Sequence, residues 1–141
     1  MKVYADTSFI ASRYLPQQFS AEVDRRMLLQ PSIFLTPFHR AEVNHAIFQQ
    51  VFRARLTPAQ ARQSLQDFEE DCTLGIWRQV GQPLTTLDTC TALARRHAAT
   101  LGVRTLDSMH VAAALELKAD CFWTFDDRQR QLAQAEGLLI D

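Results

Sequence analysis

The chain has 141 residues, of which 47% are apolar and 22% charged, and 15 basic against 16 acidic side chains give a net charge of −1. These values argue against a collagen-like, disordered or strongly basic chain, and the apolar runs fall far short of the ~20 residues that span a bilayer. We therefore expect one cytoplasmic domain over residues 1–141, without a secretory signal or membrane segment.

Two strands and two helices are predicted before residue 36. Apolar residues 2–5 and 32–35 form runs of strand length. Residues 7–15 and 21–30 have the longer patterns that are typical of helices.

Two further helices begin with the same signal, a Thr-Pro pair at 36–37 and again at 57–58. The threonine predicts an N-cap and the proline the first helical position. Gln60 adds a capping box to the second helix. We expect these helices to cover residues 37–55 and 58–72.

Strands and helices continue to alternate beyond residue 75. The remaining elements are predicted as a strand at 76–80, helices at 83–100 and 105–118, a strand at 121–125, a helix at 126–135 and a last strand at 138–140. This alternation indicates an α/β fold with a mainly parallel sheet of four to five strands. In such sheets, functional sites form at the carboxyl ends of the strands.

One face of the 37–55 helix carries four apolar side chains: Ile47, Phe48, Val51 and Phe52. We expect this face to pack mostly in the core. The alternative is that part of it forms a contact between two copies of the chain.

Four acidic residues flank apolar segments rather than lying in charged runs. Asp6 and Asp126 each follow a predicted strand, while Glu42 and Asp107 lie in the first turns of predicted helices. Each also has a structural explanation, because an acid at a helix start caps the helix or stabilises its dipole by about 0.3–1 kcal/mol. Taken together, the positions favour a shared site at one edge of the sheet.

The segments around these acids resemble a known family. They read VYADTS at 3–8, RAEV at 40–43, LDSMHVAAA at 106–114 and FWTFD at 122–126. In this order and spacing they resemble PIN-domain ribonucleases, and more narrowly the VapC-like toxins of bacterial type II toxin–antitoxin systems. The resemblance covers nearly the whole chain.

The resemblance implies a three-layer α/β/α domain with endoribonuclease activity that depends on Mg²⁺, with Mn²⁺ as a substitute. It also implies an RNA substrate, a homodimer and a cognate antitoxin protein that blocks the activity. The family's catalytic and metal-binding acids match four residues of this chain: Asp6, Glu42, Asp107 and Asp126. Its supporting hydroxyl positions match Thr7, Ser8 and Thr124. Because Asp127 adjoins Asp126, either of the two could be the fourth ligand.

Carboxylates are the donors that this chemistry requires. Mg²⁺ and Mn²⁺ prefer carboxylate oxygens, and a divalent ion both activates a water and stabilises a leaving oxygen. Two carboxylates about 5 Å apart repel by roughly 3 kcal/mol at an effective dielectric constant of about 20. A bound cation removes this repulsion and allows a negative pocket to meet a phosphodiester.

Arginines near the acidic motifs are candidates for RNA binding. The chain has 13 arginines and two lysines, and arginine suits bidentate contact with phosphate. Four arginines lie close in sequence to the acids: Arg13, Arg40, Arg104 and Arg128. The alternative is that they form surface salt bridges.

The same acids permit a second interpretation. Glu42 and His45 form a Glu-x-x-His pattern, and Asp107 and His110 form a similar one. Paired motifs of this kind hold two iron ions in carboxylate helical bundles. This alternative requires four long helices and leaves the apolar strand at 121–125 unexplained.

Two more alternatives keep the α/β fold. In one, Asp6 is the nucleophile of a phosphate-handling domain, but Lys118 is misplaced for the late lysine that such domains need. In the other, the chain is a non-catalytic PIN-like module that only binds a partner. An RNase assay with Mg²⁺ and with EDTA discriminates between this module and the enzyme.

Overall fold

The computed structural model describes residues 1–16 and 19–140. At its centre lies a five-stranded parallel sheet with the order β3-β2-β1-β4-β5. The strands are β1 (Lys2–Ala5), β2 (Ser32–Leu35), β3 (Arg78–Gln79), β4 (Cys121–Trp123) and β5 (Leu139–Ile140). The predicted α/β fold with a parallel sheet is therefore confirmed.

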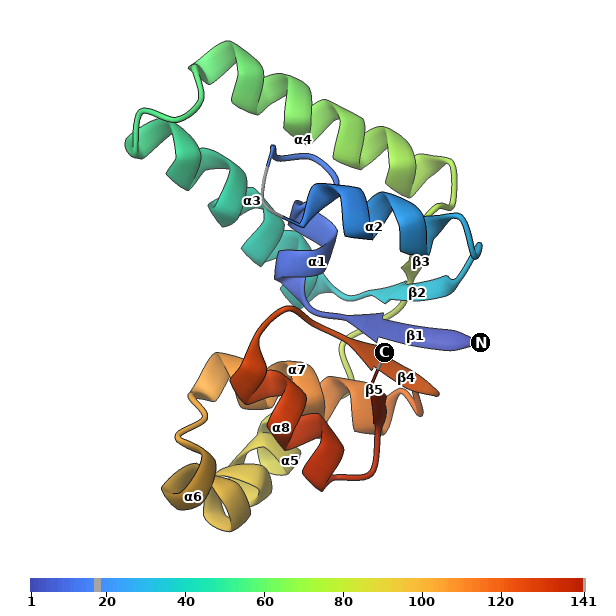
Figure 1. Cartoon of the computed structure of the whole chain (residues 1–141), viewed down its shortest axis with the longest axis vertical. Coiled ribbons are helices and arrows are strands. Elements are labelled where there is room, and N and C mark those ends of the chain that lie inside the picture. Colours follow the sequence, from blue (N-terminus) through green and yellow to red (C-terminus); the bar gives the residue numbers. More distant parts are fainter. Residues whose placement is uncertain (17–18, 141) are drawn as a thin grey trace.

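Helices cover both faces of the sheet and make three layers (Figure 1). One face carries α1 (Thr7–Ala11), α2 (Ser20–Met27), α3 (Pro37–Phe52) and α4 (Pro58–Thr73). The other carries α5 (Thr86–Leu93), the π-helical segment η1 (Ala94–Ala98), α6 (Ala99–Leu101), α7 (Thr105–Glu116) and α8 (Asp127–Ala135). Each face buries its own hydrophobic cluster against the sheet.

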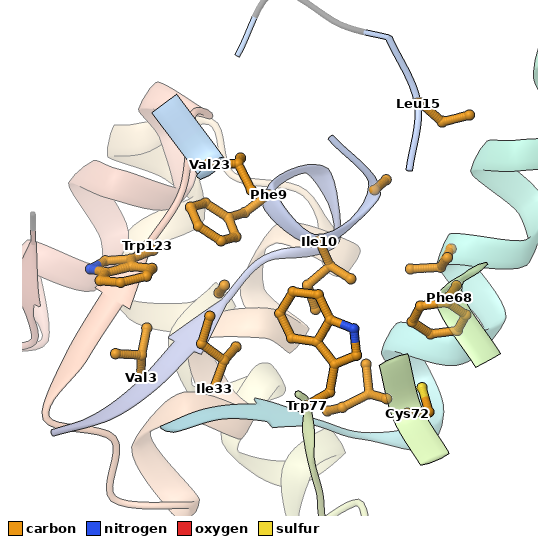
Figure 2. Close-up of a cluster of buried hydrophobic side chains, with 14 of the residues drawn as sticks. Val3, Phe9, Ile10, Leu15, Val23, Ile33, Phe68, Cys72, Trp77 and Trp123 are labelled. Carbon is orange, nitrogen blue, oxygen red and sulfur yellow. The ribbon is translucent and has the colours of Figure 1, made fainter. Parts of the chain in front are cut away.

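The two clusters are built from side chains of different size. The cluster under α1–α4 contains both tryptophans, Trp77 and Trp123, together with Phe9 and Phe68 (Figure 2). The cluster under α5–α8 includes three consecutive alanines, residues 112–114, on α7. Small side chains allow this helix to approach the sheet closely.

The central strand β1 brings the first predicted acid to the carboxyl edge of the sheet. β1 pairs with β2 on one side and with β4 on the other, where Ala5 lies opposite Trp123. The backbone N–H of Asp6 extends this pairing by donating to the Trp123 carbonyl. Asp6 therefore lies beside the end of β4, the strand that leads to Asp126.

Both Thr-Pro signals begin helices, as predicted. Thr57 and Gln60 form the expected capping box of α4. At α3, Thr36 is the N-cap and its backbone N–H donates to Nδ1 of His39, whose Nε2 donates to the Ala5 carbonyl. Burial and the charge of His110 lower the pKa of His39 to about 3 despite the hydrogen bond to Ala5, so the ring is neutral and ties α3 to β1.

Several elements are shorter than predicted. The helix predicted at 7–15 ends at Ala11. Beyond it, the N–H groups of Arg13 and Tyr14 donate to carbonyls three residues back instead of four. Pro16 also disfavours a helical conformation of the residue before it. The strand predicted at 76–80 pairs only over Arg78–Gln79. The strand predicted at 121–125 ends at Trp123, because the Thr124 hydroxyl accepts the Asp126 N–H and turns the chain into α8.

The apolar face of α3 is divided between core and surface. Ile47 is fully buried, whereas Phe48 is 45% and Phe52 is 91% exposed. The prediction that this face lies mostly in the core is therefore wrong for the two phenylalanines. Among the described residues, none of the helices is both long and apolar enough to cross a bilayer.

Candidate active site

A hollow of about 240 Å³ opens at the carboxyl edge of the sheet. All four acids singled out in the sequence line it, although they come from the ends of β1 and β4 and from α3 and α7. Its lining consists of Asp6, Thr7, Ser8, Glu42, Arg104, Leu106, Asp107, His110, Asp126 and Gln129. Residues that are up to 123 positions apart in the sequence thus meet in one place.

Asp6 is buried at the base of this hollow. One carboxylate oxygen accepts from Ser8 Oγ at 2.7 Å and from the Phe9 N–H at 3.0 Å, which makes Asp6 the N-cap of α1. The other accepts from Thr124 Oγ1 at 2.8 Å. Burial raises the pKa of Asp6, against the opposing effects of the His110 charge and of these donors. Ser8 and Thr124 thus each hydrogen-bond to one oxygen of this acid.

Glu42 is held by a hydroxyl and an imidazole. Its Oε2 accepts from Thr7 Oγ1 at 2.5 Å and lies 2.7 Å from His110 Nε2. The Tyr4 hydroxyl lies 3.1 Å from Nδ1 of the same ring. Burial acts to raise the pKa of Glu42, but the hydrogen bonds from His110 and Thr7 and the charge of His110 outweigh it, so the pKa is lowered.

His110 therefore belongs to the site, although the four-acid pattern does not include it. The sequence does carry a signal, because Asp107 and His110 lie three residues apart and face the same side of α7. Its partner Glu42 cannot be found in this way, since it lies 68 residues earlier.

Asp107 and Asp126 lie at the starts of α7 and α8. One oxygen of Asp107 accepts from the Arg104 backbone N–H at 3.0 Å and from its Nε at 3.3 Å, and the other lies 3.4 Å from Gln129 Nε2. Asp126 caps α8 by accepting from the N–H groups of Arg128 and Gln129. Both acids thus also serve as helix-start residues.

Asp127 faces away from this arrangement. Its side chain is 82% exposed and pairs with Arg130. Asp126, by contrast, lines the hollow. The geometry therefore favours Asp126 over Asp127 as the fourth acid.

The four candidate arginines occupy different surroundings. Arg104 lines the hollow and its side chain is 70% exposed. Arg13 forms an ion pair with Asp71, and Arg40 forms one with Glu69. Arg128 is exposed near the start of α8. Arg104 has the best position to meet a phosphate at the acids.

The donor set suits a hard divalent cation, because four carboxylates offer only oxygen ligands. In residues 1–16 and 19–140, no three His, Cys, Asp or Glu side chains lie close enough together to hold a metal ion as they stand. Each of the four carboxylates instead accepts hydrogen bonds from neighbouring groups of the protein.

Comparison with known protein families decides what kind of domain this is. The PIN domain family matches residues 3–135. This chain belongs to the PIN domain family. No curated protein is significantly similar to the chain in sequence.

Solved structures have the same fold at low sequence identity. VapBC2 from Rickettsia felis, bound to a promoter DNA fragment, is 12% identical with a TM-score of 0.70, covering 100% of this chain and 98% of that chain. VapC20 from Mycobacterium tuberculosis, a toxin that cleaves the sarcin-ricin loop, is 14% identical with a TM-score of 0.67, covering 97% and 96%. FitAcB from Neisseria gonorrhoeae is 19% identical with a TM-score of 0.65, covering 98% and 95%.

The PIN fold removes the di-iron alternative. A carboxylate bundle consists of long helices around a helical core, whereas this PIN domain is built around a five-stranded parallel sheet. His45 also does not face the acids, because its Nδ1 lies 2.8 Å from the Ala41 carbonyl of its own helix. The Glu-x-x-His spacing in α3 is therefore a property of the helix rather than of a metal site.

Proposed function

We propose that this PIN domain is a Mg²⁺-dependent endoribonuclease, the toxin of a VapBC-type toxin–antitoxin pair. The observation that supports the proposal most strongly is that four acids from four separate elements line a single hollow. The family match and the fold shared with VapC structures point in the same direction.

Asp6, Glu42, Asp107 and Asp126 would hold the ion, with Mn²⁺ able to replace Mg²⁺. When bound, a divalent ion lowers the pKa of a water and neutralises charge on the phosphate. Electrostatics is consistent with such binding, because burial raises the pKa of Asp6 and a neighbouring cation would stabilise its ionised form. The chain's own contribution is to place these oxygens at the end of β1 and around it.

The hydroxyl and imidazole groups fix the acids for this task. Ser8 and Thr124 hold Asp6, and Thr7 holds Glu42. His110 Nε2 donates to Glu42 Oε2, while the Tyr4 hydroxyl faces the other ring nitrogen. Glu42 is therefore kept ionised and oriented, ready to position an attacking water.

Arg104 would contact the RNA at the mouth of the hollow. Its guanidinium is exposed, and Nε already lies 3.3 Å from Asp107. Arg128 would contact the RNA from α8, close to Asp126. Arg13 and Arg40 would have to leave Asp71 and Glu69 to take part, which makes them weaker candidates.

The proposed partner proteins need binding surfaces, and a second, more apolar hollow lies beside the acids. It measures about 570 Å³, shares Thr7, Ser8, Glu42 and Leu106 with the acidic hollow, and is also lined by Phe38 and Ala46. We propose that a cognate antitoxin blocks the nuclease here, and that the exposed Phe48 and Phe52 contribute to a homodimer. We also propose a cytoplasmic location, which the resemblance to toxin–antitoxin proteins implies.

The test is cleavage of RNA by the purified chain with Mg²⁺ and with EDTA. We expect cleavage only with Mg²⁺, and we expect Asp6→Asn to abolish it while the circular dichroism spectrum stays unchanged. Asp127→Asn is the matched control, because its side chain is exposed and paired with Arg130. Equal cleavage by wild type and Asp6→Asn would contradict the proposal.

The alternative is a non-catalytic PIN-like module that only binds a partner. It is favoured by one observation, that every acid of the hollow already accepts hydrogen bonds from groups of the protein. Absence of Mg²⁺-dependent cleavage together with tight binding to the antitoxin would establish this alternative.

A further inference from the structure

Gln129 lines the acidic hollow but is neither a proposed cation ligand nor a proposed RNA contact. It belongs to the first turn of α8, and only 7% of its surface is exposed. Asp6, Asp107 and Asp126 line the same hollow. A neutral amide is thus buried among three carboxylates.

The chemistry of its neighbour fixes the orientation of this amide. Nε2 lies 3.4 Å from Oδ1 of Asp107. A carboxylate accepts hydrogen bonds and an amide oxygen also accepts, so the NH₂ group must face Asp107. The carbonyl oxygen Oε1 therefore points to the other side. It is buried, and it has no hydrogen-bond partner within residues 1–16 and 19–140.

Two other buried polar atoms in the described part of the chain share this condition, Gln82 Oε1 and Trp123 Nε1. Trp123 belongs to the hydrophobic cluster under α1–α4, and Gln82 lies in the segment between β3 and α5, where its Nε2 donates to Thr86. Gln129 differs from both because it lies in a hollow lined by acids. An unsatisfied buried acceptor is unfavourable by itself, which indicates that a donor is expected at this place.

We propose that Gln129 is a positioning residue of the divalent-cation site, with Nε2 holding Asp107 and Oε1 accepting a hydrogen bond from a cation-bound water. This inference rests on the proposed function. A neutral oxygen suits the position, because a fifth carboxylate would add repulsion to the four already present. Mg²⁺ keeps several waters when it binds to carboxylates, so the site contains donors for such an acceptor.

The experiment measures Mn²⁺ binding by electron paramagnetic resonance of the free ion. Gln129→Leu keeps the approximate size of the side chain and removes both polar groups, and we expect about 10-fold weaker binding. Gln129→Glu keeps an acceptor at the same place, and its negative charge repels the other acids only while the cation is absent, so we expect binding at least as tight as in the wild type. Gln131→Leu is the matched control, since Gln131 lies exposed on the same helix and should leave Mn²⁺ binding unchanged.

Thermal unfolding in EDTA shows whether each variant folds. Gln129→Met replaces Gln129→Leu if the latter unfolds at a lower temperature than the wild type. Unchanged Mn²⁺ affinity in the apolar variant overturns the inference. Equal weakening in the apolar and Gln129→Glu variants overturns the role of Oε1, because it leaves only the contact with Asp107.

The same data separate this inference from the proposed function. If the wild-type protein binds no Mn²⁺, both fall. If the wild type and Gln129→Leu bind Mn²⁺ equally while Asp6→Asn does not, the cation site stands and only the role of Gln129 falls.

Discussion

The two sides of the acidic hollow are held in different ways. Asp6 and Glu42 depend on side chains from distant segments, since Thr124 is 118 residues from Asp6 and His110 is 68 residues from Glu42. Asp107 and Asp126 accept from backbone N–H groups two or three residues away. The first side therefore needs tertiary contacts in addition to the local cap that Asp6 forms, whereas the backbone donors of the second side come from the start of each acid's own helix.

The largest effect on stability is expected at His110, on the side held by distant contacts. His110→Ala leaves the half-buried Glu42 and the buried Tyr4 hydroxyl without the ring that lies between them. We expect about 1–3 kcal/mol of destabilisation in urea unfolding. His45→Ala is the control, because His45 is exposed and lies near a carbonyl of its own helix. Equal losses for the two variants would contradict the comparison.

A smaller effect is expected at Asp126, on the side held by local contacts. Asp126→Ala removes the cap of α8 and should cost about 1 kcal/mol in urea unfolding. The same variant should lose RNA cleavage. Asp127→Ala should change neither quantity much, since that side chain is exposed. The reverse pattern in the cleavage assay would make Asp127 the fourth ligand.

The pH dependence of stability separates the two acids of the first side. The lowered pKa of Glu42 means that its stabilising contribution is present above the ordinary glutamate value of about 4.3 and is lost as the pH falls below it. The raised pKa of Asp6 has the opposite sign, so its contribution declines as the pH rises above about 3.9. We expect the stability difference between wild type and Glu42→Gln to shrink between about pH 6 and pH 3 in urea unfolding. A difference that grows on acidification would show that Glu42 is not stabilised as an anion.

The smallest effect on stability is expected at Arg104. Its side chain is 70% exposed, and exposed ion pairs contribute about 0–1 kcal/mol. Arg104→Ala should therefore unfold at nearly the wild-type urea concentration while its KM for RNA rises. A large loss of stability without a change in KM would instead make Arg104 a structural partner of Asp107.

The same division explains how much the sequence could predict. Caps are local, so Thr36 and Thr57 marked the starts of α3 and α4 correctly. Parallel strands were also readable, because their apolar runs are short and bounded by helices. These local patterns, together with the family resemblance, selected four acids that do meet in one hollow.

The contacts between distant segments could not be predicted. The partners of Arg13 and Arg40, Asp71 and Glu69, lie on α4, and nothing in the local sequence shows that this helix packs there. The exposure of Phe48 and Phe52 has the same cause, since periodicity defines a helix face but not how far along the helix the core extends. Gln129 was not recognised because its signal, an acceptor without a donor, exists only in three dimensions.

The pairing of β1 with β4 also has a consequence for synthesis of the chain. Asp6 leaves the ribosome before the Thr124 hydroxyl that holds it, which follows 118 residues later. At about 5–20 residues per second, this delay lasts on the order of ten seconds. A nascent chain therefore carries an incomplete hollow until its final strands and helix have been translated. The four acids of a domain with this topology can meet only after synthesis has reached α8.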